Sequence, residues 1–145
     1  MVLIFAAITL LLFFVIRPLQ KNAFYMLYFA LMMGTAVYFE MHGMKGTPFS
    51  KNILMLFLGA HFVWINSVTF IAYVVDKNAA KKHAWRIPEL QLHLLELLGG
   101  TPTAFIAQKI LRHKTKKTSY RISFVFVLAV QIAIIYYVVK TLHLM

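Results

Sequence analysis

Four long runs of apolar residues, separated by short polar stretches, dominate the chain. They cover residues 2–16, 23–39, 53–75 and 122–139. A helix needs about 20 such residues to cross a bilayer, so each run is at or near spanning length. The first run is the shortest, at about 22 Å of helix, so a spanning helix there must include flanking residues. We therefore predict spanning helices over about 2–20, 22–41, 52–75 and 121–142.

The first run also has the length of a signal-peptide core. A cleaved signal carries positive charge before its apolar stretch, and Met1-Val2-Leu3-Ile4 carries none. We favour an uncleaved first helix.

Residues 87–110 are apolar on average, but polar side chains and a Gly99-Gly100-Thr101-Pro102 break interrupt them. The two halves would make only about 15 Å and about 13 Å of helix, so neither spans alone. Hydropathy leaves three arrangements open: one broken crossing, a re-entrant hairpin, or two helices at the surface.

Charge changes this picture. The 145 residues are 61% hydrophobic and only 13% charged, which excludes an ordinary soluble domain. Lys and Arg number 15 against four acids, a net charge of +11. If residues 87–111 return to their starting side, twelve basic residues face one side and only Lys45, Lys51 and Lys140 face the other. That bias is typical of a cytoplasmic face.

We therefore predict an all-α integral membrane helical bundle forming a single domain over residues 1–145. It has four transmembrane helices, both termini outside, and a broken, non-crossing helical hairpin over about 87–111 on the cytoplasmic side. The chain contains no cysteine, which excludes disulfides and zinc-thiolate sites.

The third run carries a stripe of polar residues at helical spacing. The stripe contains Asn66, Thr69, Tyr73 and Asp76. It begins near Gly59, where a small residue allows close helix approach, and ends in an Asp76-Lys77 pair at the expected interface. Asn66 and Thr69 have a plainer interpretation, in which they form hydrogen bonds to a neighbouring helix. His61 lies opposite the stripe, so we leave it out of any site.

The first half of the hairpin places Glu89, His93 and Glu96 on one helical face, at i, i+4 and i+7. Two carboxylates beside an imidazole can bind a divalent metal or act as acid and base. They can equally form the wet face of an interfacial helix. The H-E-x-x-H metal motif is absent, so we expect no metal and no cofactor.

The Gly99-Gly100 turn lets the chain reverse and exposes backbone amides, which attract anions. A basic cluster follows the second half, and each such residue contributes about 1 kcal/mol toward anionic lipid. The cluster contains Lys109, Arg112, His113, Lys114, Lys116 and Lys117. It has no interleaved aromatic residues, so we expect no nucleic-acid partner. A positive-inside anchor is the plainer interpretation of the same cluster.

Several short motifs in series resemble a known family. They are Asp76-Lys77-Asn78-Ala79-Ala80, Arg86-Ile87-Pro88-Glu89, Leu92-His93, Gly99-Gly100 and Arg112-His113-Lys114-Thr115-Lys116-Lys117. Their order and spacing are similar to those of the small bacterial membrane family catalogued as domain of unknown function 1294. The resemblance covers roughly residues 66–120 and the span after them. It implies a multi-pass protein of the bacterial inner (plasma) membrane and supplies no established activity.

The chain departs from that family at two positions. The family turn usually reads Gly-Gly-x-Pro-Gly-Ala, whereas Thr103 stands where its last Gly would be. Tyr120 replaces a Phe that often follows the basic motif. Some relatives resemble fusions to a cold-shock nucleic-acid-binding domain, which is missing here.

We favour a non-catalytic membrane protein that binds anionic lipid headgroups, or another phosphate-bearing ligand, at the cytoplasmic face. The expected anion-binding residues are Arg86, Arg112, His113, Lys114, Lys117, Gly99 and Gly100. The residues expected to orient them are Asp76, Lys77, Glu89 and His93.

Two alternatives stay open. One is a membrane-embedded enzyme acting on lipid or a lipid-linked substrate, with Glu89 or His93 as the acid–base group and Glu89, His93 and Glu96 as the metal ligands of a metal-dependent version. The other is a small oligomeric transporter, because broken helices line substrate paths in transporters. The expected partners are anionic membrane lipids, and homo-oligomerisation is left open.

Overall fold

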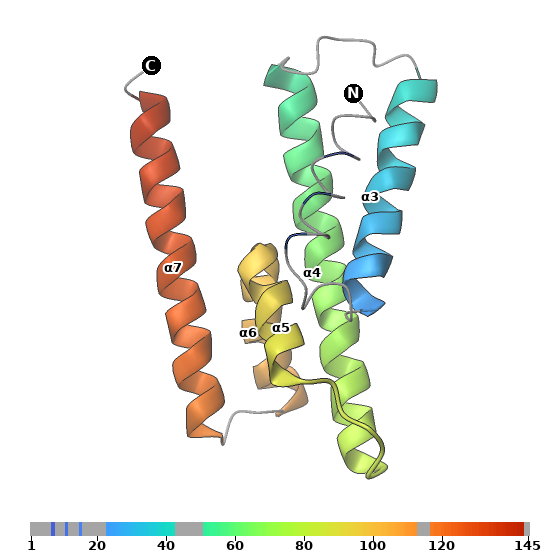
Figure 1. The fold of residues 1–145 in the computed structure, drawn as a ribbon, viewed down its shortest axis with the longest axis vertical. Coiled ribbons are helices and arrows are strands. Elements are labelled where there is room, and N and C mark those ends of the chain that lie inside the picture. Colours follow the sequence, from blue (N-terminus) through green and yellow to red (C-terminus); the bar gives the residue numbers. More distant parts are fainter. Residues whose placement is uncertain are drawn as a thin grey trace. The chain divides into compact units, whose positions relative to one another are not determined.

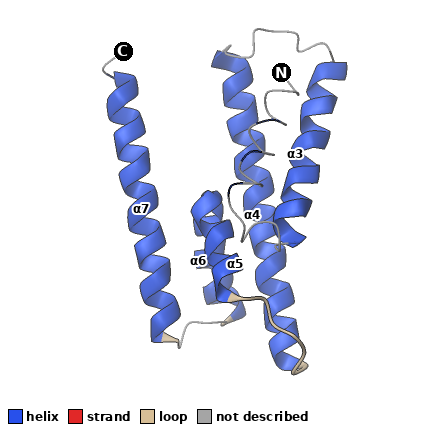
Figure 2. Ribbon diagram, viewed as in Figure 1, coloured by secondary structure: helices blue, strands red, loops and turns tan. Residues whose placement is uncertain are grey.

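The computed structural model describes residues 23–42, 51–112 and 117–143, together with Ala7, Leu11 and Val15. All regular structure in these residues is helical, which confirms the all-α prediction for the described part of the chain (Figures 1 and 2). The elements are α3 (Ala23–Met41), α4 (Lys51–Lys81), α5 (Glu89–Leu95), the π-helical turn η1 (Glu96–Gly100), α6 (Thr101–Leu111) and α7 (Thr118–His143).

Three helices in the described residues are long and apolar enough to cross a membrane. Their candidate spans are Ala23–Met41, Met55–Lys81 and Thr118–Tyr137. They correspond to the predicted spans over 22–41, 52–75 and 121–142, and they make this a membrane protein. The first predicted span, over 2–20, lies almost entirely outside the described residues. The count of four spans therefore stays a prediction.

The chain divides into two compact units, Met1–Val68 and Thr69–Met145, so α4 contributes to both. In the first unit, α3 buries Tyr25, Tyr28, Met32 and Ala36, which recur along one face of the helix. Two polar contacts join α3 to α4. The Tyr28 hydroxyl lies 2.6 Å from His61 Nδ1, and the Trp64 indole N–H donates to Thr35 Oγ1 at 2.9 Å.

In the second unit, the end of α4 buries one stripe at i, i+3, i+4 and i+7 spacing. The stripe consists of Thr69, Ala72, Tyr73 and Asp76. The hairpin contributes Leu92 and Leu95 from its first half and Ala104 and Ala107 from its second half, while α7 contributes Tyr120 and Phe124. The turn η1 contacts α5, α6 and α7, so the core of this unit surrounds the break in the hairpin.

The hairpin reverses at the predicted glycines. Gly99 has φ 122°, in the left-handed region that glycine adopts without a steric penalty. The segment α5–η1 then runs antiparallel to α6 (Figure 1). Lys117, just beyond the second half, donates to Glu89 at the start of the first half at 2.7 Å. The hairpin therefore returns to the end where it began, and one broken crossing is excluded.

Gly100 lies where the hairpin tip packs closely against α4. A Cβ atom on Gly100 would lie 2.1 Å from Thr69 Oγ1 and 2.9 Å from the Leu95 carbonyl oxygen. The sequence pointed to Gly59 for this role, and that prediction was wrong, because nothing lies within 4 Å of a Cβ built there. The hairpin tip, rather than the middle of α4, needs the small residue.

Candidate functional site: a buried glutamate and a basic end

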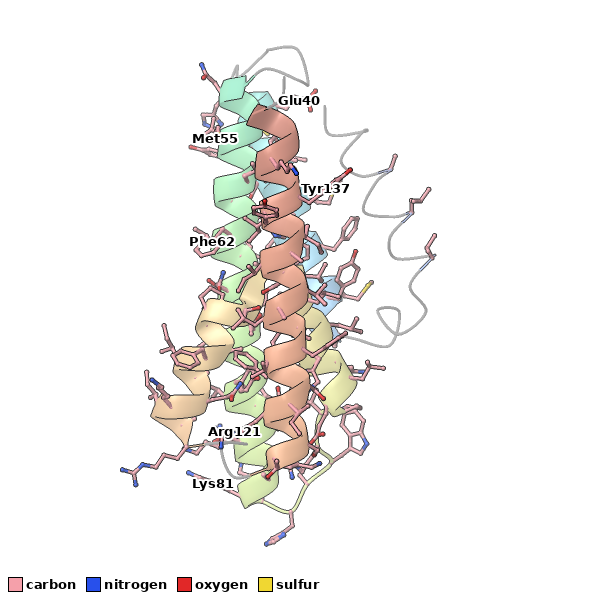
Figure 3. All side chains as sticks on the ribbon, turned by 90° about the vertical axis from the view of Figure 1, so that its left-hand side faces the viewer. Glu40, Met55, Phe62, Lys81, Arg121 and Tyr137 are labelled. Carbon is pink, nitrogen blue, oxygen red and sulfur yellow. The ribbon has the colours of Figure 1, made fainter. Side chains whose placement is uncertain are left out.

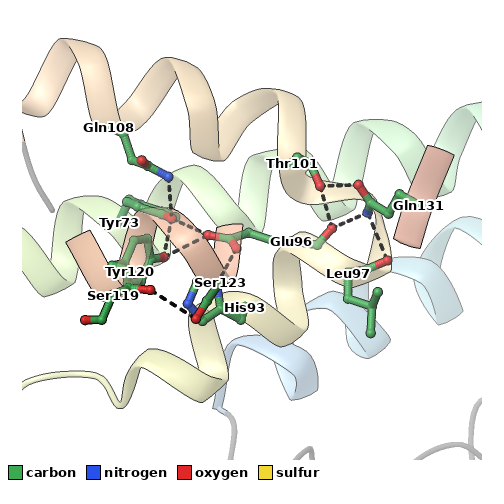
Figure 4. Close-up of polar contacts among 10 residues, drawn as sticks. All are labelled: Tyr73, His93, Glu96, Leu97, Thr101, Gln108, Ser119, Tyr120, Ser123 and Gln131. Atoms are coloured by element: carbon green, nitrogen blue, oxygen red, sulfur yellow. Dashed lines mark hydrogen bonds and ion pairs between the residues drawn. The ribbon is translucent and has the colours of Figure 1, made fainter. Parts of the chain in front are cut away.

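Glu96 is fully buried where α5 passes into η1. Its Oε1 accepts a hydrogen bond from the Tyr120 hydroxyl at 2.8 Å and another from the Tyr73 hydroxyl (Figure 4). Its Oε2 lies 2.6 Å from His93 Nδ1, one helical turn earlier. A buried carboxylate is costly without partners, and here both of its oxygens have them.

Three further contacts complete this arrangement, which we call the Glu96 cluster: Tyr73, His93, Glu96, Gln108 and Tyr120. The two tyrosine hydroxyls are 2.5 Å apart, and Gln108 Nε2 donates to the Tyr73 hydroxyl at 3.3 Å. The His93 ring stacks on Tyr120 with centroids 4.3 Å apart. The cluster thus joins α4, both halves of the hairpin and α7.

The break in the hairpin leaves backbone carbonyls that side chains satisfy. Gln131 of α7 donates through Nε2 to the Glu96 carbonyl at 2.5 Å and to the Leu97 carbonyl at 3.0 Å (Figure 4). The Thr101 hydroxyl lies 2.9 Å from the same Glu96 carbonyl and also contacts the Gln131 amide oxygen. A kink frees backbone carbonyls from the helical pattern, and these contacts supply their partners.

Asp76 is also fully buried, and its carboxylate contacts the loop between α4 and α5. Its Oδ1 accepts the Ile87 backbone N–H at 3.1 Å, and its Oδ2 lies 3.5 Å from Arg86 Nη2. Arg86 is one of the basic residues that the sequence predicts Asp76 to orient, and that role stays a prediction.

Basic residues gather at one end of the second unit, which we call the basic end. Figure 3 shows Lys81 and Arg121 near this same end. We define it by the described basic residues at the end of α4, in the loop before α5, at the end of α6 and at the start of α7: Lys77, Lys81, Lys82, Arg86, Lys109, Arg112, Lys117 and Arg121. Arg86 is paired with Asp76 and Lys117 with Glu89. Arg112 is exposed in the left-handed conformation that ends α6. His113 and Lys114 lie outside the described residues.

Gly99 and Gly100 do not join the basic residues. They lie at the hairpin tip, separated from Arg112 by the 11 residues of α6, or about 16 Å of helix. Gly100 is also buried, packed against Thr69. The expectation that the Gly-Gly turn and the basic cluster share one anion pocket was therefore wrong.

The metal alternative is not formed either. Among the described residues, no group of three or more His, Asp or Glu side chains could hold a metal ion. His93 contacts Glu96, whereas Glu89 accepts a hydrogen bond from Lys117 outside the cluster. The residues Glu89, His93 and Glu96 share a helical face, and only the last two share a site.

Sequence reasoning identified part of the Glu96 cluster. Of the predicted polar stripe, Tyr73 joins the cluster, Thr69 packs on Gly100, and the Asn66 amide donates to the Phe62 carbonyl of its own helix. The sequence analysis did not place Thr101, Gln108, Tyr120 or Gln131 in a site. Tyr120 was identified only as a departure from the family motif.

The family match falls mostly within the second unit. The family model described as "Protein of unknown function (DUF1294)" matches residues 66–120. The chain is also 31% identical over 80 residues to "Uncharacterized protein YsdA" of Bacillus subtilis (strain 168), covering 55% of this chain and 90% of that relative. The chain belongs to the DUF1294 family. The DUF1294 segment includes the whole Glu96 cluster, but α3 and Gln131 lie outside it. No solved structure matches the chain.

Proposed function

We propose that this chain binds anionic phospholipid headgroups at its basic end. The observation that carries the proposal is the excess of positive charge there. Eight described basic residues face two acids, Asp76 and Glu89, because Glu96 is turned into the cluster. Arg86 forms an ion pair with Asp76, and Lys117 forms one with Glu89. The remaining positive charge is available to a phosphate, at about 1 kcal/mol per residue near an anionic surface.

An exposed aromatic residue supports placing this end at a membrane interface. Trp85 is 78% exposed and precedes Arg86 in the loop between α4 and α5. Trp and Tyr are enriched at the two membrane–water interfaces. On α7, exposed Tyr136 and Tyr137 lie at the opposite end of the span, about 24 Å along the helix from Arg121. That separation fits one bilayer with an interface at each end.

Positions along α7, measured from the same two interfaces, support a re-entrant hairpin rather than two helices at the surface. Gln131, which bonds the hairpin tip, lies ten residues or about 15 Å along α7 from Arg121. If α7 crosses the bilayer, the tip reaches its middle. We place the basic end on the cytoplasmic face by the positive-inside bias and retain four spans as part of this proposal.

The test is native mass spectrometry of the detergent-purified protein. It is offered phosphatidylglycerol, phosphatidylcholine or inorganic phosphate. We expect phosphatidylglycerol to be retained more strongly than phosphatidylcholine. Retention of inorganic phosphate with no preference between the lipids would identify a soluble phosphate ligand and overturn lipid recognition.

Charge-removing variants locate the binding. Lys82→Gln and Arg112→Gln should each lower phosphatidylglycerol retention about fivefold, the equivalent of about 1 kcal/mol. The matched control is Lys140→Gln, which removes one positive charge near the other end of α7 and should leave retention unchanged. Equal losses in all three variants would mean non-specific attraction to the whole chain.

A second function, acid–base catalysis on a lipid or lipid-linked substrate, is favoured by one observation. His93 is held through Nδ1 by the buried Glu96 carboxylate while its side chain stays 14% exposed. A carboxylate that fixes one imidazole nitrogen orients the other for proton transfer. We expect cells producing the protein to change their lipid profile, and cells producing His93→Asn not to. Identical profiles in both would overturn this function.

A further inference from the structure

A hollow of about 310 Å³ lies on α7 at the basic end. Its lining residues are Thr118, Arg121, Ile122 and Val125. They are spaced i, i+3, i+4 and i+7, so they form one face of the first two turns of α7. None of them belongs to the residues that the sequence analysis assigned to a site.

The polarity of the lining changes along α7. Thr118 and Arg121 supply a hydroxyl and a guanidinium at the start of α7, next to the basic end. Ile122 and Val125 supply aliphatic surface, and Val125 lies seven residues or about 10 Å along the helix from Thr118. A polar end followed by an apolar end has the same order of polarity as a phospholipid, from its phosphate to its acyl chain.

The Arg121 guanidinium suits a phosphate for two reasons. No acid in the described residues pairs with it, because Asp76 binds Arg86, Glu89 binds Lys117 and Glu96 lies in the cluster. A guanidinium also presents a planar fork of N–H donors that binds phosphate oxygens in pairs, which a lysine does not. Arg121 also lines the hollow next to the aliphatic side chains of Ile122 and Val125.

We propose that this hollow is a site for one anionic phospholipid molecule. Arg121 and Thr118 hold its phosphate, and one acyl chain lies along Ile122 and Val125. The site rests on the proposed lipid-binding function and makes it specific. The other basic residues attract anionic lipid to the surface, whereas Arg121 selects and retains one molecule.

Native mass spectrometry with phosphatidylglycerol tests the site through a pair of matched variants. Arg121→Gln and Lys82→Gln each remove one positive charge from the basic end, and only Arg121 lines the hollow. We expect Arg121→Gln to lower retention of the most tightly held lipid at least twentyfold, against about fivefold for Lys82→Gln. Arg121→Lys, which keeps the charge and loses the planar fork, should fall between wild type and Arg121→Gln. It also serves as the test if Arg121→Gln does not fold.

A second pair tests the apolar end of the hollow. Val125→Trp fills this end and should abolish tight retention of one lipid, while Ile135→Trp, on an exposed part of α7 outside the hollow, should not. The native chain has no cysteine, so Val125→Cys introduces a unique thiol. We expect no cross-link between two copies of this variant in vesicles. Efficient cross-linking would make a second copy the occupant and overturn the proposal.

The outcomes separate the two proposals. If wild type shows no preference for phosphatidylglycerol over phosphatidylcholine, the proposed function itself fails. If wild type has the preference and Arg121→Gln and Lys82→Gln lose it equally, the general function stands and the hollow is not a site. Equal retention in Val125→Trp and wild type overturns the placement of the acyl chain.

Discussion

The two units of the chain use buried polar residues in different ways. In the first unit, Tyr28–His61 and Trp64–Thr35 are separate contacts between helices whose own backbones are regular. In the second unit, one carboxylate, Glu96, receives hydrogen bonds from both Tyr73 and Tyr120 and also meets His93. In the first unit, loss of one contact leaves the other contact unchanged. In the second unit, the contacts share the Glu96 carboxylate, so loss of one changes the others.

The difference follows from the backbone. A continuous helix satisfies its own N–H and C=O groups, so side-chain bonds between α3 and α4 add only packing preference. The hairpin reverses at Gly99, and its freed carbonyls need Gln131 and Thr101. A broken helix therefore requires polar side chains at fixed places, and the DUF1294 match covers the hairpin that contains this break.

The largest predicted effect is at the hairpin tip. Gly100→Ala forces a Cβ against Thr69 and the Leu95 carbonyl, and we expect it to lower the free energy of unfolding by about 3 kcal/mol. Unfolding in mixed detergent–SDS micelles, followed by circular dichroism, measures this change. Gly59→Ala is the control. Its Cβ meets nothing within 4 Å, so we expect a neutral effect or a gain of up to about 1 kcal/mol.

Thr69→Gly in the Gly100→Ala background should recover part of the loss, because it removes the Thr69 side-chain atoms that the new methyl group meets. Equal stability of Gly100→Ala and Gly59→Ala would contradict the close approach at the tip.

An intermediate effect is expected in the Glu96 cluster. Glu96→Gln keeps the shape of the side chain but replaces an acceptor oxygen with a donor amide, so one or more of its three partners loses its bond. We expect a loss of about 2 kcal/mol in the free energy of unfolding. Glu40→Gln, at an exposed position of α3, is the control and should have no effect on the free energy of unfolding.

The connectedness of the cluster can be measured separately. Tyr73→Phe and Tyr120→Phe remove hydroxyls that bond the same Glu96 oxygen and each other. Their combined effect should differ from the sum of the single effects by at least about 0.5 kcal/mol. Strict additivity would show that the cluster is a set of independent contacts.

The smallest effect is expected in the first unit. Tyr28→Phe removes one hydroxyl contact with His61, and we expect a loss of about 0.6 kcal/mol, as for single hydrogen bonds between membrane helices. Tyr38→Phe, at an exposed position on the same helix, provides the baseline. A Tyr28→Phe loss as large as that of Glu96→Gln would remove the contrast between the units.

Sequence patterns predicted the elements better than the site. Apolar run length located three spans, and Gly99-Gly100 located the reversal, because both signals act within one segment. Charge bias indicated that the hairpin returns, and the Lys117–Glu89 contact agrees. The helix α4 runs to Lys81, beyond the apolar run, because Asn78-Ala79-Ala80 contains neither Gly nor Pro to end it.

The site depended on contacts that span large sequence separations. Helical spacing grouped Glu89 with His93 and Glu96, but the choice of partner depended on Lys117 and on Tyr73 and Tyr120, which periodicity within one helix cannot place. Likewise, nothing local distinguished Gly59 from Gly100 as the point of close approach. That distinction required knowing which helix faces each glycine.

Gln131, which donates hydrogen bonds to the carbonyls at the hairpin tip, is synthesised after the hairpin. Gln131 follows Leu97 by 34 residues, and Tyr120 follows Glu96 by 24. Until α7 packs beside the hairpin, the Leu97 carbonyl lacks its donor Gln131 and the Glu96 carboxylate lacks its donor Tyr120. Water or another polar group has to bind both in the meantime, so the hairpin gains its full set of hydrogen bonds only when α7 is in place.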